Sequence, residues 1–237
     1  MNRADFFNKE WLLDVNRVHP PKEEQIVDDK LRLHRAERLY KFPEKFFSDF
    51  VSIIKQEDVR YYPYIHEFKK KLADTNGLNE DNIFLNNGSS ENIRVFYDAF
   101  AIRNREVLIT EYCYPMHKVY ALLNGSKVKE IKYKKDLVID YDSLIENIDE
   151  NKCCIVLANP NSPIGDILSL NQIEEILKKS NKYNIPVLID EAYIEYSEQE
   201  SCIKFLEKYD NLVISRTFSK AYGCAGLRIG YLLANKG

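Results

Sequence analysis

The stretch of sequence that decides the fold is Ser215-Arg-Thr-Phe-Ser-Lys-Ala-Tyr-Gly-Cys-Ala-Gly-Leu-Arg228. It places Lys220 in a loop of small residues directly after an apolar run, and it ends on an arginine. Hydroxyl groups at Thr217 and Ser219 and the guanidinium of Arg228 suit phosphate oxygens, while the Lys220 amine can form an imine with a carbonyl carbon. The alternative is an exposed lysine that follows a strand, so this stretch has to be weighed together with others.

The remainder of the chain alternates short β-rich runs with helical patterns. We expect strands over residues 83–86, 107–112, 127–133, 153–158, 186–190, 212–217 and 229–234. We expect helices over residues 5–18, 43–57, 66–74, 91–101, 116–123, 141–148, 169–182 and 201–208. This alternation predicts an α/β fold with a mostly parallel sheet, in which ligands lie beyond the carboxyl ends of the strands.

Composition narrows the class of protein. The 237 residues are 45% hydrophobic, which is ordinary for a globular protein with one core. The net charge is -3 and charges of both signs are interspersed, so we expect neither a nucleic-acid nor a membrane partner. Five cysteines without C-x-x-C spacing and a start without an export signal indicate a reduced, cytoplasmic protein. No metal site is expected.

Two loops at predicted strand ends suit a phosphorylated ring. Asn86-Asn-Gly-Ser-Ser-Glu91 leads into a helix, so amide groups near Ser89 and Ser90 can cradle a phosphate. The alternative there is an ordinary turn with a serine N-cap. After the next strand, Tyr112-Cys-Tyr-Pro-Met-His117 offers Tyr114 for stacking on a flat heteroaromatic ring, the alternative being core packing.

The next two segments supply polar groups for the ring itself. Asn159-Pro-Asn-Ser-Pro-Ile-Gly165 presents Asn161 and Ser162, which suit a ring hydroxyl or a substrate carboxylate, although turn chemistry explains the prolines and the glycine. Asp190 ends an apolar strand, where a charge is costly unless it meets a cation such as a protonated pyridine nitrogen. The Tyr193 hydroxyl can bond a ring oxygen. The alternative for Asp190 is a helix cap.

A lysine that can form an imine and an acidic partner for a pyridine nitrogen together point to pyridoxal 5'-phosphate as the cofactor. A nicotinamide cofactor is disfavoured by the glycine spacing. Gly223, Gly226 and Gly230 do not form the G-x-G-x-x-G pattern that follows the first strand of a dinucleotide-binding fold.

The quoted segments occur in the order and approximate spacing seen in one family. Over about residues 31–237 the chain resembles fold-type I pyridoxal phosphate-dependent aminotransferases of class I/II, and it looks like the histidinol-phosphate aminotransferase family among them. The resemblance implies an N-terminal arm over residues 1–35 and the large cofactor-binding domain of that fold over residues 36–237. Family members continue into a smaller C-terminal domain, which is expected to be absent because the sequence stops at Gly237.

The resemblance also implies roles for single residues. Lys220 would form the internal aldimine and carry the proton, Asp190 would pair with the pyridinium, and Tyr193 would bond the ring oxygen. Tyr114 would stack on the ring, and Tyr62 would reach the phosphate of a neighbouring subunit in a homodimer. The residues assigned to the cofactor phosphate are Ser89, Ser90, Glu91, Thr217, Ser219 and Arg228.

The implied activity is amino-group transfer between an amino acid, or an amino-alcohol phosphate, and a 2-oxo acid, by a ping-pong mechanism in cytoplasmic amino acid biosynthesis. The chain departs from the family at Ser162, where the bond to the ring oxygen is expected either to be weaker or to shift to Asn161, and at His34–Arg38, which replaces an Asn-Glu-Asn-Pro signature. Two alternatives stay open: a decarboxylase or lyase on the same scaffold, and a truncated, non-catalytic module for cofactor binding or dimerisation.

Overall fold

A computed structural model describes residues 35–236 of the chain. The helix predicted over residues 5–18, and nearly all of the arm predicted over residues 1–35, lie outside the described residues. All seven predicted strands are present, with ends that differ from the prediction by at most two residues. They are β1 Ile83–Asn86, β2 Glu106–Thr110, β3 Lys127–Ile131, β4 Lys152–Ala158, β5 Val187–Asp190, β6 Leu212–Thr217 and β7 Gly230–Ala234.

The strands form a single sheet in the order β1-β7-β6-β5-β4-β2-β3. Every neighbouring pair is parallel except the two that involve β7, which runs antiparallel to both β1 and β6. The prediction of a mostly parallel sheet is therefore confirmed. Because β7 is reversed, its first residue, Gly230, pairs with Asn86 and Thr217, which are the last residues of its two neighbours. The start of β7 thus lies at the same edge as the ends of the parallel strands.

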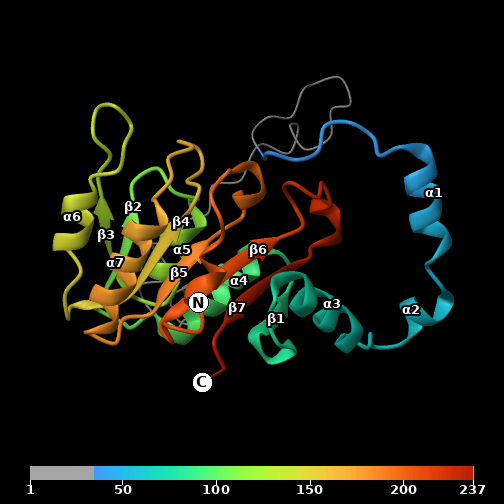
Figure 1. Cartoon of the computed structure of the whole chain (residues 1–237), viewed down its shortest axis with the longest axis horizontal. Helices are drawn as coiled ribbons and strands as arrows, with labels where there is room; N and C mark the ends of the chain where they lie inside the picture. The colour runs from blue at the N-terminus through green and yellow to red at the C-terminus, as the bar shows by residue number, and fades with distance from the viewer. Residues whose placement is uncertain (1–34, 237) are drawn as a thin grey trace, which may run out of the picture.

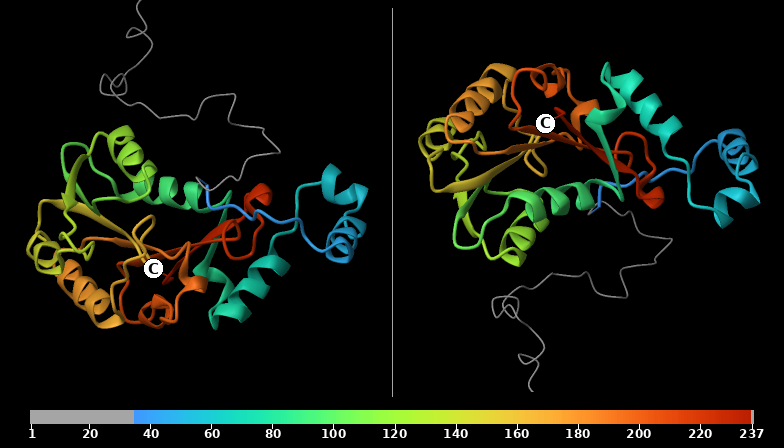
Figure 2. Two further views of the ribbon diagram at one scale, coloured as in Figure 1. Left: turned by 90° about the horizontal axis from the view of Figure 1, so that it is seen from above. Right: turned by 90° about the horizontal axis from the view of Figure 1, so that it is seen from below.

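Helices cover both faces of this sheet, as Figure 2 shows from above and below. The α-helices are α1 Glu44–Ser52, α2 Gln56–Arg60, α3 His66–Asn76, α4 Ser89–Phe100, α5 Met116–Leu123, α6 Tyr141–Glu146 and α7 Leu170–Asn181. Short 3-10 turns are η4 Glu80–Asn82, η5 Ile194–Tyr196, η6 Cys202–Phe205 and η7 Ala225–Leu227. Gly77 closes α3 with a φ of 66°, as its position predicts.

Two helix predictions are wrong. The helix predicted over residues 43–57 is broken, because the Asp58 carboxylate accepts a hydrogen bond from the Lys55 amide at 2.8 Å and begins a new helix, α2. The helix predicted over residues 201–208 is reduced to the 3-10 turn η6. Its first residues are drawn to a side chain from another part of the chain: the Ser201 hydroxyl and the Cys202 amide both donate to the carboxylate of Glu191.

The sheet separates two apolar cores. Side chains alternate along each strand, so that in β4 Ile155 and Leu157 face one core while Cys154 and Val156 face the other. The first core is closed by α3, α6 and α7, and the second by α4 and α5 (Figures 1 and 2). Strands buried on both faces cannot slip in register without exposing apolar side chains, so the residues at their ends are held in fixed positions.

The segment that carries α1 and α2 lies apart from the sheet (Figure 1). Neither helix contains a buried residue, although α1 displays Phe46, Phe47 and Val51 with about half of each side chain exposed. Within residues 35–236, no helix has the length and apolar character needed to cross a membrane. All five cysteines fall in the described part of the chain, and all five are free thiols.

Candidate active site

All the residues predicted to bind the cofactor except Tyr62 gather at the edge of the sheet where the parallel strands end and β7 begins. They come from five connections. Gly88 and the serines after it follow β1, Tyr114 follows β2, and Asn161 and Ser162 follow β4. Asp190 ends β5 and Tyr193 follows it, while Thr217, Ser219, Lys220 and Arg228 belong to the connection from β6 to β7. This is the edge at which open α/β sheets bind ligands. The strand pairs Ala158 with Asp190 and Asp190 with Ser215 fix the centre of the site.

The N-terminus of α4 forms a cradle for an anion. The helix begins at Ser89, and Gly88 is its N-cap, with a φ of 80° and without a side-chain cap. The alternative of a serine N-cap is therefore wrong. The first amide groups of a helix have no partner within it, so those of Ser89 and Ser90 can donate to an anion. The Ser90 hydroxyl also lies 3.4 Å from the Tyr114 hydroxyl, which connects the cradle to the predicted stacking residue.

Arg228 places its guanidinium beside this cradle. Nη1 lies 3.5 Å from the Ser219 hydroxyl, and Nη2 lies 3.4 Å from the Asn87 carbonyl oxygen. Arg228 has a φ of 53°, a left-handed conformation that is strained for a residue with a side chain. On the other side, the Thr217 hydroxyl accepts from the Ser219 amide at 3.1 Å, which tightens the loop before Lys220.

Two glycines permit this arrangement because backbones and side chains approach closely. A Cβ at Gly88 would lie 2.7 Å from Arg228 Nη2, at a positive φ that favours glycine. A Cβ at Gly230 would lie 2.5 Å from the carbonyl carbon of Gly88 and 2.8 Å from the Ser89 nitrogen. The start of β7 therefore presses directly on the turn that opens α4.

Glu91 differs from the other residues predicted to bind phosphate. Its carboxylate accepts from the Asn87 amide at 2.7 Å, and its own amide donates to the Gly88 carbonyl at 3.1 Å. Both polar groups are thus used within the turn, and a carboxylate would repel a phosphate. We interpret Glu91 as a residue that holds the shape of the cradle.

Asp190 lies at the centre of the edge. It is buried, and its Oδ1 atom has no hydrogen-bond partner in the described part of the chain. Burial raises the pKa of its carboxyl group to about 6, assisted by the neighbouring charge of Glu191, while Ser215, the Ala192 amide and Lys220 act in the opposite direction. The alternative role as a helix cap is wrong, because the N-cap of the following turn, η5, is Tyr193. An unpaired buried carboxyl oxygen fits a cationic N–H donor from a ligand.

Lys220 lies near Asp190 with its amine turned towards the start of the described chain. Its Nζ atom donates to the Arg35 carbonyl at 2.8 Å and lies 5.4 Å from the centre of the Tyr193 ring. The same N-terminal segment contacts the lysine loop at a second point, because a Cβ on Gly223 would lie 2.8 Å from Cδ of Arg38. The segment that begins at residue 35 therefore passes over the lysine.

The loop after β4 borders a cavity of about 400 Å³ next to Tyr193, lined also by Ser162 and Tyr196. Asn161 is buried and holds the loop: its amide group donates towards the Thr110 hydroxyl at 3.4 Å, and its side-chain oxygen accepts from the Ile164 amide at 3.4 Å. Ser162 is half-buried. Asn161 and Ser162 are the two residues predicted to bind a ring oxygen, and of these the Asn161 side chain already has hydrogen-bond partners within the protein.

Two predicted aromatic residues have contrasting surroundings. Tyr114 is 38% exposed, and its ring meets the edge of His117 with centroids 6.0 Å apart. His117 lies on α5 and is buried, which lowers its pKa to about 4, so it is neutral at physiological pH. Tyr62, between α2 and α3, is 98% exposed. Within one chain, α2 and the segment after it lie away from the ends of the central strands (Figure 1).

Asn92 is a site-organising residue that the sequence analysis missed. It is fully buried in α4, and its amide nitrogen lies 3.1 Å from the Ser215 hydroxyl, 3.1 Å from the Arg216 carbonyl and 2.9 Å from the Tyr231 carbonyl. It thereby attaches α4 to β6 and β7. The available signal was a polar amide on the apolar face of an amphipathic helix, which has to find partners when it is buried.

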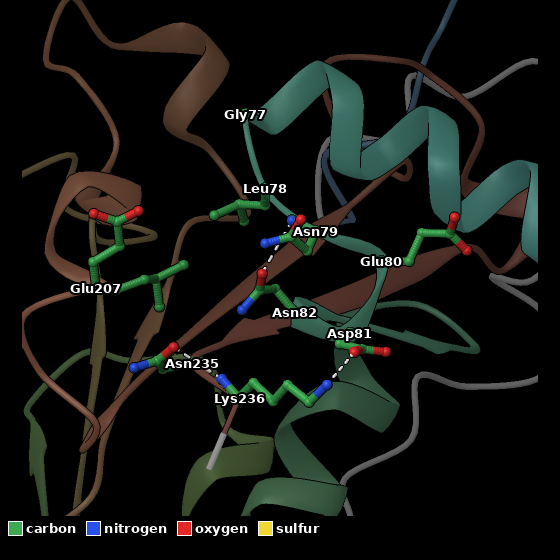
Figure 3. Close-up of a pocket in the computed structure, with 10 residues that line it drawn as sticks. Gly77, Leu78, Asn79, Glu80, Asp81, Asn82, Glu207, Asn235 and Lys236 are labelled. Atoms are coloured by element: carbon green, nitrogen blue, oxygen red, sulfur yellow. Dashed lines mark hydrogen bonds and ion pairs between the residues drawn. The ribbon is translucent and has the colours of Figure 1, made fainter.

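A second cavity, of about 560 Å³, lies at the opposite ends of β1 and β7, where Asn79 to Asn82 meet Asn235 and Lys236. Figure 3 shows that its polar side chains largely pair with one another, including Lys236 with Asp81 and the Asn82 side chain with the Asn79 amide. None of the predicted site residues lines it. The chemistry that the sequence predicts therefore belongs to the other edge of the sheet.

The chain is similar to known proteins over most of its described length. The sequence model of the family described as aminotransferase class I and II matches residues 36–236. The chain belongs to the aminotransferase class I and II family. Among its relatives, a histidinol-phosphate aminotransferase of Brachyspira hyodysenteriae is 38% identical over 76% of this chain and 50% of its own length. Histidinol-phosphate aminotransferase 1 of Carboxydothermus hydrogenoformans is 35% identical over 99% of this chain and 65% of its own length.

Solved structures place the fold among aminotransferases. The histidinol-phosphate aminotransferase of Clostridium acetobutylicum superposes with a TM-score of 0.71 and 26% identity, over 82% of this chain and 57% of that one. The enzyme of Sinorhizobium meliloti, solved in complex with pyridoxal-5'-phosphate, gives a TM-score of 0.64 and 27% identity, over 72% of this chain and 46% of that one. The chain thus spans about half to two thirds of the length of these relatives. The predicted fold-type I architecture is confirmed, and the roles of the site residues stay predictions.

Replacing Gly230 by alanine should destabilise the chain by about 1–3 kcal/mol, because the new Cβ would overlap the backbone of Gly88. Gly226 is a matched control, since a Cβ there meets nothing within 4 Å, and Gly226→Ala should change stability by no more than about 0.5 kcal/mol. Urea unfolding of both variants measures the difference. Equal effects would show that the close approach does not exist.

Replacing Asp190 by asparagine should change how stability depends on pH in the cofactor-free chain. The folded carboxyl group has a pKa of about 6 and the ordinary value is 3.8, so between these values the folded state binds the proton more tightly than the unfolded state. The wild-type chain therefore loses stability relative to D190N as pH rises from about 4 to 7, by up to about 3 kcal/mol. Urea unfolding across that range tests this. The exposed variant Asp98→Asn is the control, and a pH-independent difference for D190N would contradict the prediction.

Proposed function

We propose that this chain carries the pyridoxal 5'-phosphate site of an aminotransferase. The observation that carries the proposal is the unpaired, buried Oδ1 atom of Asp190 at the same edge as Lys220 and the anion cradle of α4. An oxygen in that state fits the protonated nitrogen of a pyridine ring. Family membership and a relative solved in complex with pyridoxal-5'-phosphate support the proposal.

The residues present fit both ends of this cofactor. For the phosphate, the amides of Ser89 and Ser90 and the guanidinium of Arg228 supply donors, and the hydroxyls of Thr217 and Ser219 lie beside them. For the ring, Tyr114 offers an exposed aromatic face, and Asp190 binds the nitrogen. Tyr193 and the half-buried Ser162 line the adjoining cavity, where a ring oxygen or a substrate carboxylate can be bound.

When bound, the cofactor supplies an aldehyde that an amine can hold covalently and a ring that withdraws electrons from the substrate α-carbon. The chain's own part is to hold and move protons. With the cofactor bound, Lys220 would be the amine that holds the aldehyde, and its Nζ atom, when free, would be the base that takes the α-proton. Asp190, as an anion, keeps a proton on the ring nitrogen, and burial of this pair away from water strengthens their attraction. The contact of Lys220 with the Arg35 carbonyl has to open when the amine reacts.

The proposed reaction is amino-group transfer from an amino acid, or an amino-alcohol phosphate, to a 2-oxo acid in two half-reactions. The relatives named histidinol-phosphate aminotransferase support an amino-alcohol phosphate as one substrate class. A cytoplasmic place in amino acid biosynthesis belongs to the same proposal.

A homodimer is also part of the proposal. Exposed apolar side chains gather on the segment of α1 and α2, namely Leu39, Tyr40, Phe46, Phe47, Val51, Ile53, Ile54, Val59, Tyr61, Tyr62, Tyr64 and Ile65. Short helices without buried residues are marginal in water, so a second copy that covers this surface would stabilise them. It would also bring Tyr62 to the phosphate of the neighbouring subunit, which explains why one chain leaves this tyrosine exposed.

Lys220→Ala should abolish covalent cofactor binding. The wild-type chain, mixed with pyridoxal 5'-phosphate, should develop a visible absorption band and retain the label after borohydride reduction and unfolding. The variant should lose both, while Lys204→Ala, an exposed lysine paired with Glu200 at 3.2 Å, keeps both. A wild-type chain that stays unlabelled would overturn the proposed function.

A single-turnover experiment on the same preparation distinguishes amino-group transfer from decarboxylation. Loaded protein mixed with a panel of amino acids should convert the cofactor to its amine form without release of carbon dioxide. Release of carbon dioxide without the amine form would identify a decarboxylase and contradict the proposed transfer.

Phe47→Asp should weaken self-association at least about tenfold, because a charge would be buried within the apolar surface that the second copy covers. The fold of the body should be unaffected, since Phe47 contributes nothing to either core. Tyr183→Asp, at an exposed tyrosine beyond α7, is the matched control. Sedimentation equilibrium measures both; unchanged association of the Phe47 variant would refute the assignment of this surface.

A further inference from the structure

Glu191, the residue directly after Asp190, is a buried carboxylate that the proposed chemistry does not use. Its side chain is fully buried. The carboxylate accepts from the Ser201 hydroxyl at 2.8 Å, from the Cys202 amide at 2.7 Å and from Nε of Arg216 at 2.8 Å. Three hydrogen-bond donors, one of them charged, therefore hold the Glu191 carboxylate next to Asp190, the predicted partner of the ring nitrogen.

Arg216 is placed by the same strands that place Asp190. It follows Ser215 on β6, and Ser215 is the strand partner of Asp190 and accepts the Glu191 amide on its carbonyl at 2.9 Å. The Arg216 side chain is only 11% exposed, and its Nη1 atom lies 3.5 Å from a second carboxylate, that of Glu195. Arg216 is thus the cation shared by two carboxylates behind the site.

A buried ion pair is a costly way to stabilise a fold, since apolar side chains of similar volume stabilise a core at least as well. Besides stability, this buried ion pair can have a second effect, namely an effect of its charges on the neighbouring Asp190. Two charged groups act directly on the Asp190 carboxyl group, the carboxylate of Glu191 and the amine of Lys220, and Arg216 in turn pairs with Glu191 and lies near Glu195. Without the guanidinium, the negative charge of Glu191 beside Asp190 would lose its cationic partner.

We propose that Arg216 and Glu191 are positioning residues for Asp190: Arg216 favours the anionic form of Asp190 that would meet the ring nitrogen, and Glu191 holds Arg216 and the end of β5 in place. Arg216 compensates the negative charge beside Asp190, and Glu191 fastens the guanidinium and the η6 turn to the strand. This inference rests on the proposed function for its ligand, whereas its electrostatic part concerns Asp190 alone and can be measured without cofactor.

The two residues should affect Asp190 in opposite directions. Glu191→Gln removes a negative charge and keeps the shape, so the pH midpoint at which Asp190 ionises should fall. Arg216→Gln leaves carboxylates uncompensated, so the midpoint should rise. Each shift should be on the order of one pH unit, as expected for a unit charge within about 10 Å at an effective dielectric constant near ~20. The double variant should return close to the wild type, and Arg216→Lys, which keeps the charge, should shift the midpoint little.

The first measurement uses the full chain without cofactor. The free energy of unfolding of each variant is compared with that of the same variant carrying Asp190→Asn, across pH 4 to 8, because this difference reports the titration of Asp190. Opposite shifts for E191Q and R216Q support the inference. Shifts of the same sign, or none, overturn it, because a purely structural role lowers stability without moving the midpoint. Should R216Q fail to fold, E191Q and R216K still decide the matter.

The second measurement titrates pyridoxal 5'-phosphate by its absorbance over the same pH range. The dissociation constant should rise as pH falls through the Asp190 midpoint. The pH at which this rise occurs should be lower for E191Q and higher for R216Q, and D190N should show no such rise. Midpoints that move in the cofactor-free chain while no variant binds the cofactor would overturn the proposed function and leave the charge balance standing. Cofactor binding with unmoved midpoints would overturn the inference and leave the function standing.

Discussion

The reversed strand β7 is the constraint on which the site depends. Because it runs antiparallel to both neighbours, its first residue, Gly230, lies at the edge where the parallel strands end, against the turn that opens α4. The chain can then lead from β6 through the Lys220 loop to Arg228 without leaving that edge. A parallel strand in this place would begin at the opposite edge, and Arg228 would lie far from the α4 N-terminus.

Around this constraint the site combines groups with contrasting surroundings. The phosphate cradle combines the half-buried first residues of α4 with the exposed guanidinium of Arg228, whose present partners are a hydroxyl group and two carbonyl oxygens. Asp190 is instead enclosed by the ends of β4, β5 and β6, and one of its oxygens is unpaired. The first arrangement favours binding of a charged group from solution, and the second favours strong recognition of one cationic donor. A molecule that satisfies both carries an anionic group and a cationic N–H donor.

Support behind the site comes from residues with no direct part in the predicted chemistry. Asn92 attaches α4 to the neighbouring strands, and the Glu191 and Arg216 pair fixes the ends of β5 and β6. The same pair explains why the helix predicted over residues 201–208 is only a short turn: its first groups donate to Glu191. A local helical pattern was overridden by a buried carboxylate that required donors, which is a demand no local sequence pattern expresses.

The sequence by itself determined the seven strands, the α/β alternation and the chemical types at the strand ends, because hydrophobic periodicity and turn residues are local properties. It also indicated that Lys220, Asp190 and Arg228 belong to one predicted cofactor site. It could not tell that the Glu91 carboxylate turns back onto its own loop. Only the tertiary structure decided the direction of β7, the contact of Gly230 with Gly88, and which carboxyl oxygen is left unpaired. These depend on residues distant in sequence that meet only when the sheet is assembled, and there burial and packing, rather than local preference, determine which groups find a partner.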